Sequence, residues 1–318
     1  MNTSPQVIPC ARRAFAALAA LAALLLVVCN TLGKPADGKL EKTGVAGQLR
    51  QPADATSLGP VAGSPWRLRL PNNVLLEMLP VAAGSFTMGS PRSEPEREPY
   101  EKGAEAQHRV NITKPYWLGK YEVTQAQWQA VTGRNPSHFK GASRPVENVS
   151  WHDAVEFCAK LTAQERAAGR LPAGYRYTLP TEAQWEYACR AGTTTPFSTG
   201  DNLTTKQANY DGKLPYNRNA KGEYRGTTMD VGSFPANAWG FHDMHGNVWE
   251  WCSDWYETSP AGGDDPLGAA SGDDRVFRGG ALSSFAQSCR SALRFLLLPS
   301  ISNGDLGFRL ALSSTGAK

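Results

Sequence analysis

The sequence has no strong excess of charge of either sign, few histidines and few cysteines. Its 318 residues include 33 Lys and Arg, 29 Asp and Glu, 5 His and 6 Cys. Removing Arg12 and Arg13 from those 33 leaves 31 basic residues against 29 acidic ones. No basic stripe of the kind that follows a phosphate backbone is present. We therefore expect no nucleic acid among the partners of this protein.

Missing motifs exclude or disfavour further classes. No strand–helix alternation with a glycine-rich phosphate loop is found, which excludes a doubly wound α/β sheet. No nucleophile-elbow motif surrounds Ser284, so a hydrolase built on that serine and a distant histidine is disfavoured. His242 and His245 stand close together in the stretch HDMH, with no further histidine nearby in sequence. Loop structure is therefore favoured over a transition-metal pair.

The most apolar stretch is too short to span a bilayer, which takes ~20 residues. It runs from Ala14 to Val28, 15 residues, directly after Arg12 and Arg13. A basic start followed by an apolar run of this length is typical of an export leader. Residues 1–30 are therefore predicted to be a signal peptide or an N-terminal anchor. The protein is expected to be periplasmic or otherwise exported, with membrane contact only through residues 14–32 if the leader is not cleaved.

Composition changes after the leader. Residues 31–65 are rich in Gly, Pro, Ala and Asp without an apolar period, which predicts a flexible linker, and residues 66–318 are predicted to form the folded part. Export makes disulfides possible. The four cysteines beyond the leader are Cys158, Cys189, Cys252 and Cys289. They allow three pairings, and two or four of them are expected to be bridged.

Local signals predict both helices and strands. Capping-box pairs place helix starts at Thr124 with Gln127, at Ser150 with Asp153 and at Thr181 with Gln184. Strands are expected from Leu75, at Phe86 to Met88 and over 116–123, with an exposed loop over 91–109. Beyond Gly192 regular periodicity disappears for over eighty residues. The pattern indicates one α+β domain held together by long ordered loops.

The segment 239–256, WGFHDMHGNVWEWCSDWY, contains four tryptophans. Over its whole length they follow neither a period of two nor one of 3.6. We therefore expect an irregular loop pinned by large aromatic side chains, the kind of loop on which sites are often built.

Nine sequence blocks, taken together, resemble one known family. They are MGS (88–90), KYEVTQAQW (120–128), NPSHF (135–139), PVENVSWHDAVEFC (145–158), LPTEAQWEYACRAG (179–192), GNVWEW (246–251), RVFRGG (275–280), CRSALR (289–294) and GFR (307–309). In this order they resemble the formylglycine-generating enzyme, or sulfatase-modifying factor, family. The resemblance implies a single α+β domain, related to C-type lectins and poor in regular structure.

The catalytic chemistry of that family is altered here. Its enzymes oxidise a sulfatase cysteine with two cysteines that bind Cu(I), and those positions correspond to Ser284 and Cys289. A serine hydroxyl is a hard oxygen that does not replace a thiolate on Cu(I), so copper is not expected. Cys289 remains either a redox thiol or, as favoured, a structural cysteine with Cys252 as the first partner to test. Cys158 and Cys189 resemble bridged cysteines of the family, but their partners correspond to Arg294 and Leu310.

The resemblance also implies calcium sites. Asp243 and Glu250 resemble side-chain ligands of a structural Ca²⁺, with the backbone carbonyls of Gly246 and Val248 between them. Hard oxygen ligands on a tight loop suit this ion. A second, less well matched calcium site corresponds to Asn209, Tyr210 and Glu223.

Two functions follow as expectations. The favoured one is a calcium-stabilised periplasmic binding or regulatory module that has lost formylglycine generation and contacts another envelope protein, for example by promoting activation of a membrane threonine kinase in type VI secretion. The alternative is a periplasmic oxidoreductase that matures a pyoverdine-type siderophore chromophore or oxidises a sulfatase cysteine. Arginines gather near the end of the chain, and they either present an anion-binding surface or, more commonly, brace a loop-rich core: Arg278, Arg290, Arg294 and Arg309.

Overall fold

The computed structural model describes residues 63–97 and 104–314. The expected leader (1–30) and almost all of the expected linker (31–65) lie outside the described residues. Among the residues that are described, no helix combines the length and apolar character needed to cross a membrane.

The largest sheet joins the beginning of the described chain to its end. Its strands run in the order β1-β2-β5-β12-β6, with bounds β1 Trp66–Leu70, β2 Val74–Val81, β5 Tyr116–Gly119, β12 Ala311–Ser314 and β6 Tyr175–Thr178. A short 3₁₀ turn, η1 (Pro71–Asn73), connects β1 and β2. Because β12 pairs with both β5 and β6, the last strand lies inside the sheet.

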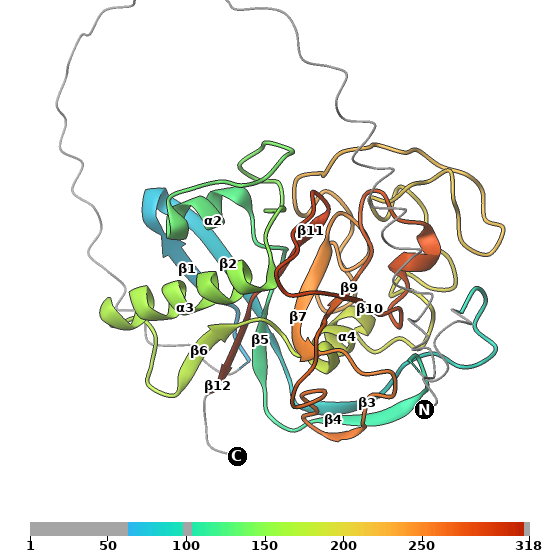
Figure 1. Ribbon diagram of the computed structural model, residues 1–318, viewed down its shortest axis with the longest axis horizontal. Helices are drawn as coiled ribbons and strands as arrows, with labels where there is room; N and C mark the ends of the chain where they lie inside the picture. Colours follow the sequence, from blue (N-terminus) through green and yellow to red (C-terminus); the bar gives the residue numbers. More distant parts are fainter. Residues whose placement is uncertain (1–62, 98–103, 315–318) are drawn as a thin grey trace, which may run out of the picture. The chain divides into compact units, whose positions relative to one another are not determined.

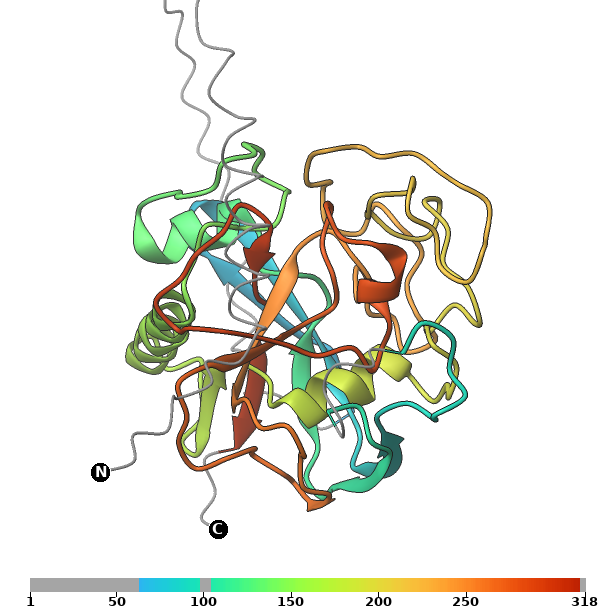
Figure 2. The same cartoon turned by 45° about the vertical axis from the view of Figure 1, so that its right-hand side comes forward.

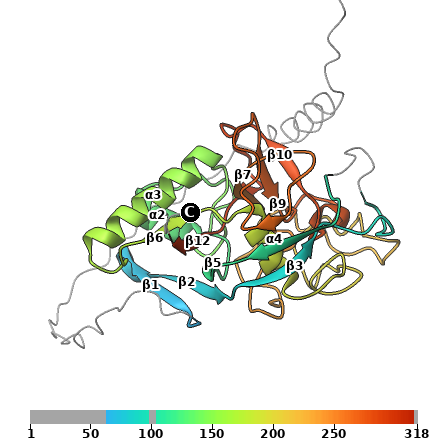
Figure 3. The ribbon, with the colours of Figure 1, turned by 90° about the horizontal axis from the view of Figure 1, so that it is seen from below.

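Two helices pack against this sheet (Figures 1 and 3). They are α2 (Gln125–Thr132) and α3 (Trp151–Ala167). Trp128 of α2 stacks on Phe157 of α3 with ring centroids 5.2 Å apart, and this pair joins the main apolar core. A third helix, α4, spans Glu182–Arg190. All three helices begin at the predicted capping boxes, so those helix starts are confirmed.

A second sheet corrects the prediction for the tryptophan-rich segment. The strands β10-β9-β7-β11 lie side by side, with bounds β7 Trp249–Trp255, β9 Arg275–Arg278, β10 Phe295–Leu297 and β11 Leu306–Gly307. Only the first part, 239–248, is irregular. Trp249 and Trp251 pack edge-on against Phe277 at 5.0 and 5.8 Å between ring centroids. The aromatic side chains therefore hold a strand as well as a loop.

A third sheet corrects the predicted exposed loop over 91–109. It consists of β3 (Gly84–Met88), β4 (His108–Ile112) and β8 (Gly263–Asp264), so 108–109 is already strand. Glu94 and Glu105 are 7% and 5% exposed. They are buried because both carboxylates pair with Arg290, a residue that local sequence patterns could not associate with them.

The predicted loop-rich character is confirmed by the long segment between α4 and β7. Residues 191–248 contain no helix or strand, and they gather on the side of α4, away from α2 and α3 (Figures 1 and 2). Side chains such as Phe197, Leu203 and Tyr216 form a separate small core there. The domain is therefore mixed α+β, with much of its backbone in ordered loops.

The expected disulfides are absent from the described residues. Cys158, Cys189, Cys252 and Cys289 are all free and buried, so the pairing of Cys289 with Cys252 is wrong. The residues at the expected partner positions explain the difference. Leu310 packs in the same apolar cluster as Cys158, and Arg294 makes an ion pair with Glu182 at 2.6 Å.

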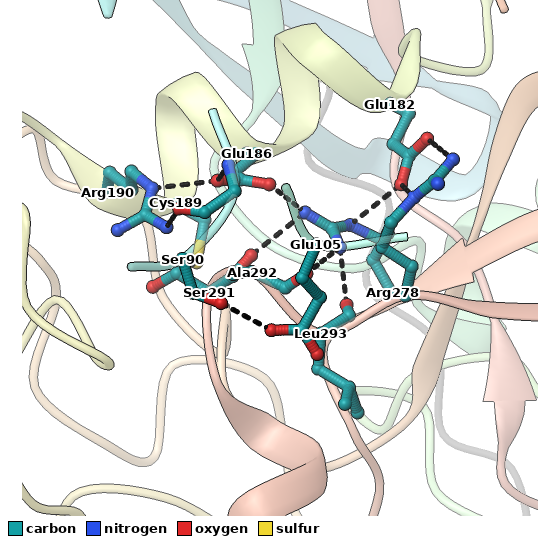
Figure 4. Close-up of polar contacts among 12 residues, drawn as sticks. Ser90, Glu105, Glu182, Glu186, Cys189, Arg190, Arg278, Ser291, Ala292 and Leu293 are labelled. Carbon is teal, nitrogen blue, oxygen red and sulfur yellow. Dashed lines mark hydrogen bonds and ion pairs between the residues drawn. The ribbon is translucent and has the colours of Figure 1, made fainter. Parts of the chain in front are cut away.

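Buried arginine–glutamate pairs hold the loops to α4 and to the second sheet (Figure 4). Arg278 contacts Glu186 and donates to the carbonyl oxygen of Ala292 at 2.9 Å. Arg190 pairs with the same Glu186 at 2.8 Å. The bracing role favoured for the arginines is therefore what the structure shows. Such pairs leave a costly buried charge when one partner is removed.

Removing one guanidinium tests this dependence. Arg290→Met should lower the free energy of unfolding by about 3–5 kcal/mol, because Glu94 and Glu105 would remain buried without a cation. Urea denaturation of both proteins measures the change. Lys160→Met is the matched control, because Lys160 pairs with Glu156 at the surface with side chains 49% and 64% exposed, and its effect should stay within about 0.5 kcal/mol. An equal loss of unfolding free energy in the two variants would contradict the bracing role of Arg290.

Candidate functional site

Ser284 and Cys289, the residues at the family's thiol positions, lie on the same short stretch of chain. Ser284 closes a turn in which its Oγ accepts the Ala281 amide at 3.0 Å and its own amide donates to the Ala281 carbonyl at 2.9 Å. Cys289 ends the 3₁₀ helix η2 (Ala286–Cys289). Ser284 is therefore half-buried in a turn, whereas the side chain of Cys289 points into the protein.

The environment of Cys289 keeps its sulfur protonated. The residue is 0% exposed, and its Sγ packs so closely on Gly280 that a Cβ at Gly280 would overlap it. Burial, followed by the nearby Cys189, raises the pKa of the Cys289 thiol far above its ordinary value. A thiol that stays neutral is neither a nucleophile nor a good soft-metal ligand. Of the two positions, one therefore holds a hydroxyl and the other a buried thiol.

Two apolar side chains are exposed beside Ser284. Phe285 is 49% exposed and Leu214 is 40% exposed. A hydrogen bond from the Ala286 amide to the Leu214 carbonyl, 3.1 Å, holds the two segments together, and the Asp211 amide donates to the Ser284 carbonyl at 3.0 Å. Exposed apolar side chains in a fixed arrangement are a feature of protein-binding surfaces.

The proposed calcium loop contains an unsatisfied carboxylate oxygen. Asp243 is 7% exposed, its Oδ2 accepts the Gly232 amide at 2.7 Å, and its Oδ1 has no partner. Gly246 follows at φ 85°, where glycine is favoured. Glu250 is held by Arg309 through two 2.6 Å hydrogen bonds and by Trp185 at 2.7 Å. Asp243 therefore remains available as a ligand, whereas most of the Glu250 carboxylate is occupied.

Sequence reasoning missed one member of this cluster, Glu122. It is 1% exposed and accepts hydrogen bonds from the Asn247 side chain at 2.7 Å and from the Val248 amide at 3.1 Å. Burial, followed by the charges of Asp243 and Glu250, raises the pKa of Glu122 well above its usual value. Three carboxylates thus face one guanidinium, that of Arg309. The signal in the sequence was a glutamate between apolar neighbours in YEVT.

The residues of the second, weaker calcium set make separate contacts. Asn209 is 0% exposed, with an unpartnered Oδ1 and an Nδ2 that donates to the Thr227 carbonyl at 2.9 Å. The Tyr210 hydroxyl donates to the Leu203 carbonyl at 3.0 Å. The side chain of Glu223 is 64% exposed and pairs with Arg225 at 3.2 Å. Across residues 63–97 and 104–314, no group of three or more His, Cys, Asp or Glu side chains is arranged to hold a metal ion.

The two histidines of HDMH organise loops. One ring nitrogen of His242 lies 2.8 Å from the Phe234 carbonyl, and one of His245 lies 2.8 Å from the Cys289 carbonyl. Burial lowers the pKa of His245 to about 4, so this imidazole is neutral near pH 7. The favoured loop role agrees with these contacts.

The comparisons with known proteins identify the domain. Residues 69–314 match the family described as "Sulfatase-modifying factor enzyme 1-like domain". The formylglycine-generating enzyme of Mus musculus is 36% identical over 214 residues, which cover 64% of this chain and 53% of that enzyme. The chaperone protein LppX of Paenibacillus barcinonensis is 37% identical over 183 residues, 46% of this chain and 65% of that protein. The chain thus spans about half the length of the mouse enzyme that it matches.

Solved structures agree with this match. Treponema denticola variable protein 1 superposes with a TM-score of 0.65 and 30% identity, covering 78% of this chain and 98% of that chain. PvdO from Pseudomonas aeruginosa superposes with a TM-score of 0.64 and 28% identity, covering 80% and 99%. The family resemblance and the loop-rich α+β fold are confirmed.

The burial of the cysteines predicts their reactivity. In the folded protein, iodoacetamide at about pH 8 should label none of the four cysteines from Cys158 to Cys289, because the thiolate is the reactive form and none of the four sulfurs is exposed. All four should be labelled in denaturant. Peptide mass spectrometry reports each position separately. Rapid labelling of Cys289 in the folded state would show that its thiol is accessible and would contradict the site described above.

Proposed function

The chain belongs to the sulfatase-modifying factor family, and from that premise we propose that it acts as a calcium-stabilised binding or regulatory module rather than as a formylglycine-generating oxidase. The expected leader in residues 1–30 places this role in the periplasm or elsewhere outside the cytoplasm. The partner is then another envelope protein. A membrane threonine kinase of type VI secretion, whose activation the protein promotes, is the specific partner that we propose.

One observation carries the proposal. Ser284 replaces one thiol, and Cys289 is a wholly buried, protonated thiol beneath Gly280. Cysteine oxidation in this family depends on two thiolates that share Cu(I), and soft sulfur ligands cannot be replaced by a hydroxyl. The chain therefore has the family's scaffold without its metal-binding sulfur pair.

The surface around Ser284 supports binding. Phe285 and Leu214 expose apolar side chains beside the turn where the missing thiol would be, and backbone hydrogen bonds hold both segments in place. A rigid apolar surface binds a partner with little loss of conformational entropy. The same turn can thus serve recognition where related enzymes perform oxidation.

Calcium suits the charge of the acidic cluster around Asp243. Glu122, Asp243 and Glu250 are opposed by Arg309, and the unpartnered Oδ1 of Asp243 offers a hard oxygen. The proposed ligands are Asp243, the Gly246 and Val248 carbonyls and the remaining lone pair of Glu250. The ion would supply positive charge and hold the loop before β7 in its left-handed turn.

An oxidoreductase is the second candidate, and the similarity to PvdO favours it. That structure covers 80% of this chain at 28% identity. Such an enzyme would act on a siderophore-type chromophore or on a sulfatase cysteine, and it would need an oxidising group other than a Cys289–Ser284 copper site.

The binding surface can be tested by site-specific cross-linking. A photo-reactive residue in place of Phe285 should capture one envelope protein in cells, whereas the same residue in place of Leu267, 55% exposed on the β8 side of the domain, should not. Leu214→Asp should abolish capture from position 285 without changing the melting temperature. Purified protein should also consume no oxygen with a thiol peptide and Cu(I). Turnover that disappears in Cys289→Ala would overturn the proposal in favour of an oxidase.

Calcium binding can be tested by melting at two pH values. Burial raises the pKa of Asp243 from 3.8 to about 6. A carboxyl whose pKa is raised on folding stabilises the folded state below its unfolded pKa, and this contribution is lost as pH rises through about 6. Without calcium, this carboxyl should therefore contribute less stability at about pH 7.5 than at about pH 5. Calcium should restore that loss, raising the melting temperature by roughly 5 °C or more at about pH 7.5 and much less at about pH 5.

Asp243→Asn is the variant for this experiment, because it removes the charge and keeps the size of the side chain. It should make the calcium-dependent shift clearly smaller than in the wild-type protein. Glu223→Gln, which alters an exposed acid of the weaker set, should leave the shift intact. If the wild-type protein melts identically with calcium and with chelator at both pH values, the ion has no structural role here.

A further inference from the structure

Buried glutamates in this domain are, with few exceptions, matched by arginine. The pairs are Glu94 and Glu105 with Arg290, Glu165 with Arg170, Glu182 with Arg294, Glu186 with Arg190 and Arg278, and Glu250 with Arg309. Glu122 belongs to the proposed calcium cluster. Glu147 is the other exception: it is 0% exposed, and within residues 63–97 and 104–314 it forms no ion pair.

The Glu147 carboxylate is held by one oxygen only. Its Oε1 accepts the Phe139 amide at 2.8 Å, whereas its Oε2 has no hydrogen-bond partner. The backbone of the residue is also fixed, because its amide donates to Ser137 Oγ at 3.2 Å. The free oxygen is therefore aimed in one direction by the surrounding structure. A buried carboxylate oxygen without a partner is costly unless something unseen satisfies it.

The free oxygen faces the turn before β11. A Cβ built on Gly304 would lie 3.8 Å from Glu147 Oε2, so the missing side chain leaves room beside that oxygen. The two segments lie side by side, because the Asn148 amide donates to the Asn303 carbonyl at 2.9 Å. The next residue, Asp305, brings a second carboxylate, and its charge acts on Glu147.

Asp305 connects this place to the functional surface. Its Oδ2 accepts the Ser283 hydroxyl at 2.9 Å, and its carbonyl accepts the Trp249 amide at 2.8 Å. Ser283 precedes Ser284, so Asp305 is joined directly to the turn with the altered thiol position. The charge of Lys140 acts on Glu147, but its Nζ donates to the Asn135 carbonyl at 3.3 Å.

From this arrangement we propose that Glu147 and Asp305 form a second site for a hard divalent cation, separate from the calcium loop at Asp243. Two carboxylates without a guanidinium carry a charge of −2 when both are ionised, and carboxylate oxygens are the ligands that Ca²⁺ and Mg²⁺ prefer. An ammonium group on a ligand would have to displace protein atoms to reach an oxygen that is wholly buried. A small ion with water or carbonyl ligands completes the site with less disturbance.

The site would act on recognition. A cation between 147 and 305 would tie the segment after NPSHF to the turn before β11 and, through Asp305 and Ser283, fix the exposed turn at Ser284. Loops without regular structure are often held in this way by bound ions. The role of this ion is positioning, since Glu147 is wholly buried and Asp305 accepts a hydrogen bond from Ser283.

Calcium titration of the full-length Asp243→Asn protein tests the proposal, because that variant removes the other candidate site. Calorimetry at about pH 7.5 should detect one Ca²⁺ or Mg²⁺ per chain. Glu147→Gln added to this background should weaken binding at least tenfold, and so should Asp305→Asn. Glu156→Gln, which alters a glutamate 64% exposed on α3, is the matched control and should leave binding unchanged. Circular dichroism confirms that each variant is folded.

Two outcomes would overturn the proposal. The first is the absence of divalent-ion binding in Asp243→Asn, or binding that Glu147→Gln and Asp305→Asn leave unchanged. The second is a Glu147→Gln protein that melts at a higher temperature than its parent at about pH 8 in the presence of calcium, because the site would then hold a proton. The wild-type protein and Asp243→Asn could instead bind the same single ion, with both new variants losing it. That result would contradict the calcium site at Asp243 and support the site at Glu147 and Asp305.

Discussion

The pairing of buried guanidinium groups with buried carboxylates is the interaction on which the rest of this domain depends. Residues 191–248 have no helix or strand to satisfy their backbone, and the sheets beside them are short. Arg290 joins the segment around Glu94 and Glu105 to the end of η2, bridging 196 residues of sequence in one case. Each charge is stable in the interior only in the presence of its partner. These pairs therefore select one arrangement of loops that hydrophobic packing alone would leave poorly defined.

Two groups of buried acids depart from this matching. Asp243 and Glu122 are two buried acids that share a single guanidinium with Glu250, and Glu147 with Asp305 has none. Both groups flank Trp249: Val248 and Glu250 are its neighbours in sequence, and the Asp305 carbonyl accepts its amide. Trp249 is itself packed against Phe277 and Phe295. Cation binding at either group would therefore affect the turn at Ser284 through strand β7, which carries this tryptophan.

Local features of the fold could be predicted from the sequence, and long-range ones could not. The three capping boxes involve residues three apart, so Thr124, Ser150 and Thr181 identified helix starts correctly. The strand β7 was missed because the tryptophans were assessed together with Trp239. Trp249, Trp251 and Trp255 all occupy odd positions, the period of one strand face. The proposed calcium loop was found by resemblance, whereas Glu147 and Asp305 are 158 positions apart in number and nothing in either neighbourhood indicates the other.

The partners that would form disulfides with Cys158 and Cys189 have been replaced in this chain without loss of the fold. At the two positions that would hold the partner cysteines, Leu310 packs in the apolar cluster and Arg294 makes an ion pair with Glu182. Neither replacement depends on the redox state of its surroundings. At Ser284 a hydroxyl completes a turn by accepting the Ala281 amide. The residues that maintain the fold are therefore separate from those that perform oxidation in related enzymes. This separation explains how the chain can keep the family's architecture while its exposed turn, bordered by Phe285 and Leu214, becomes available for recognition.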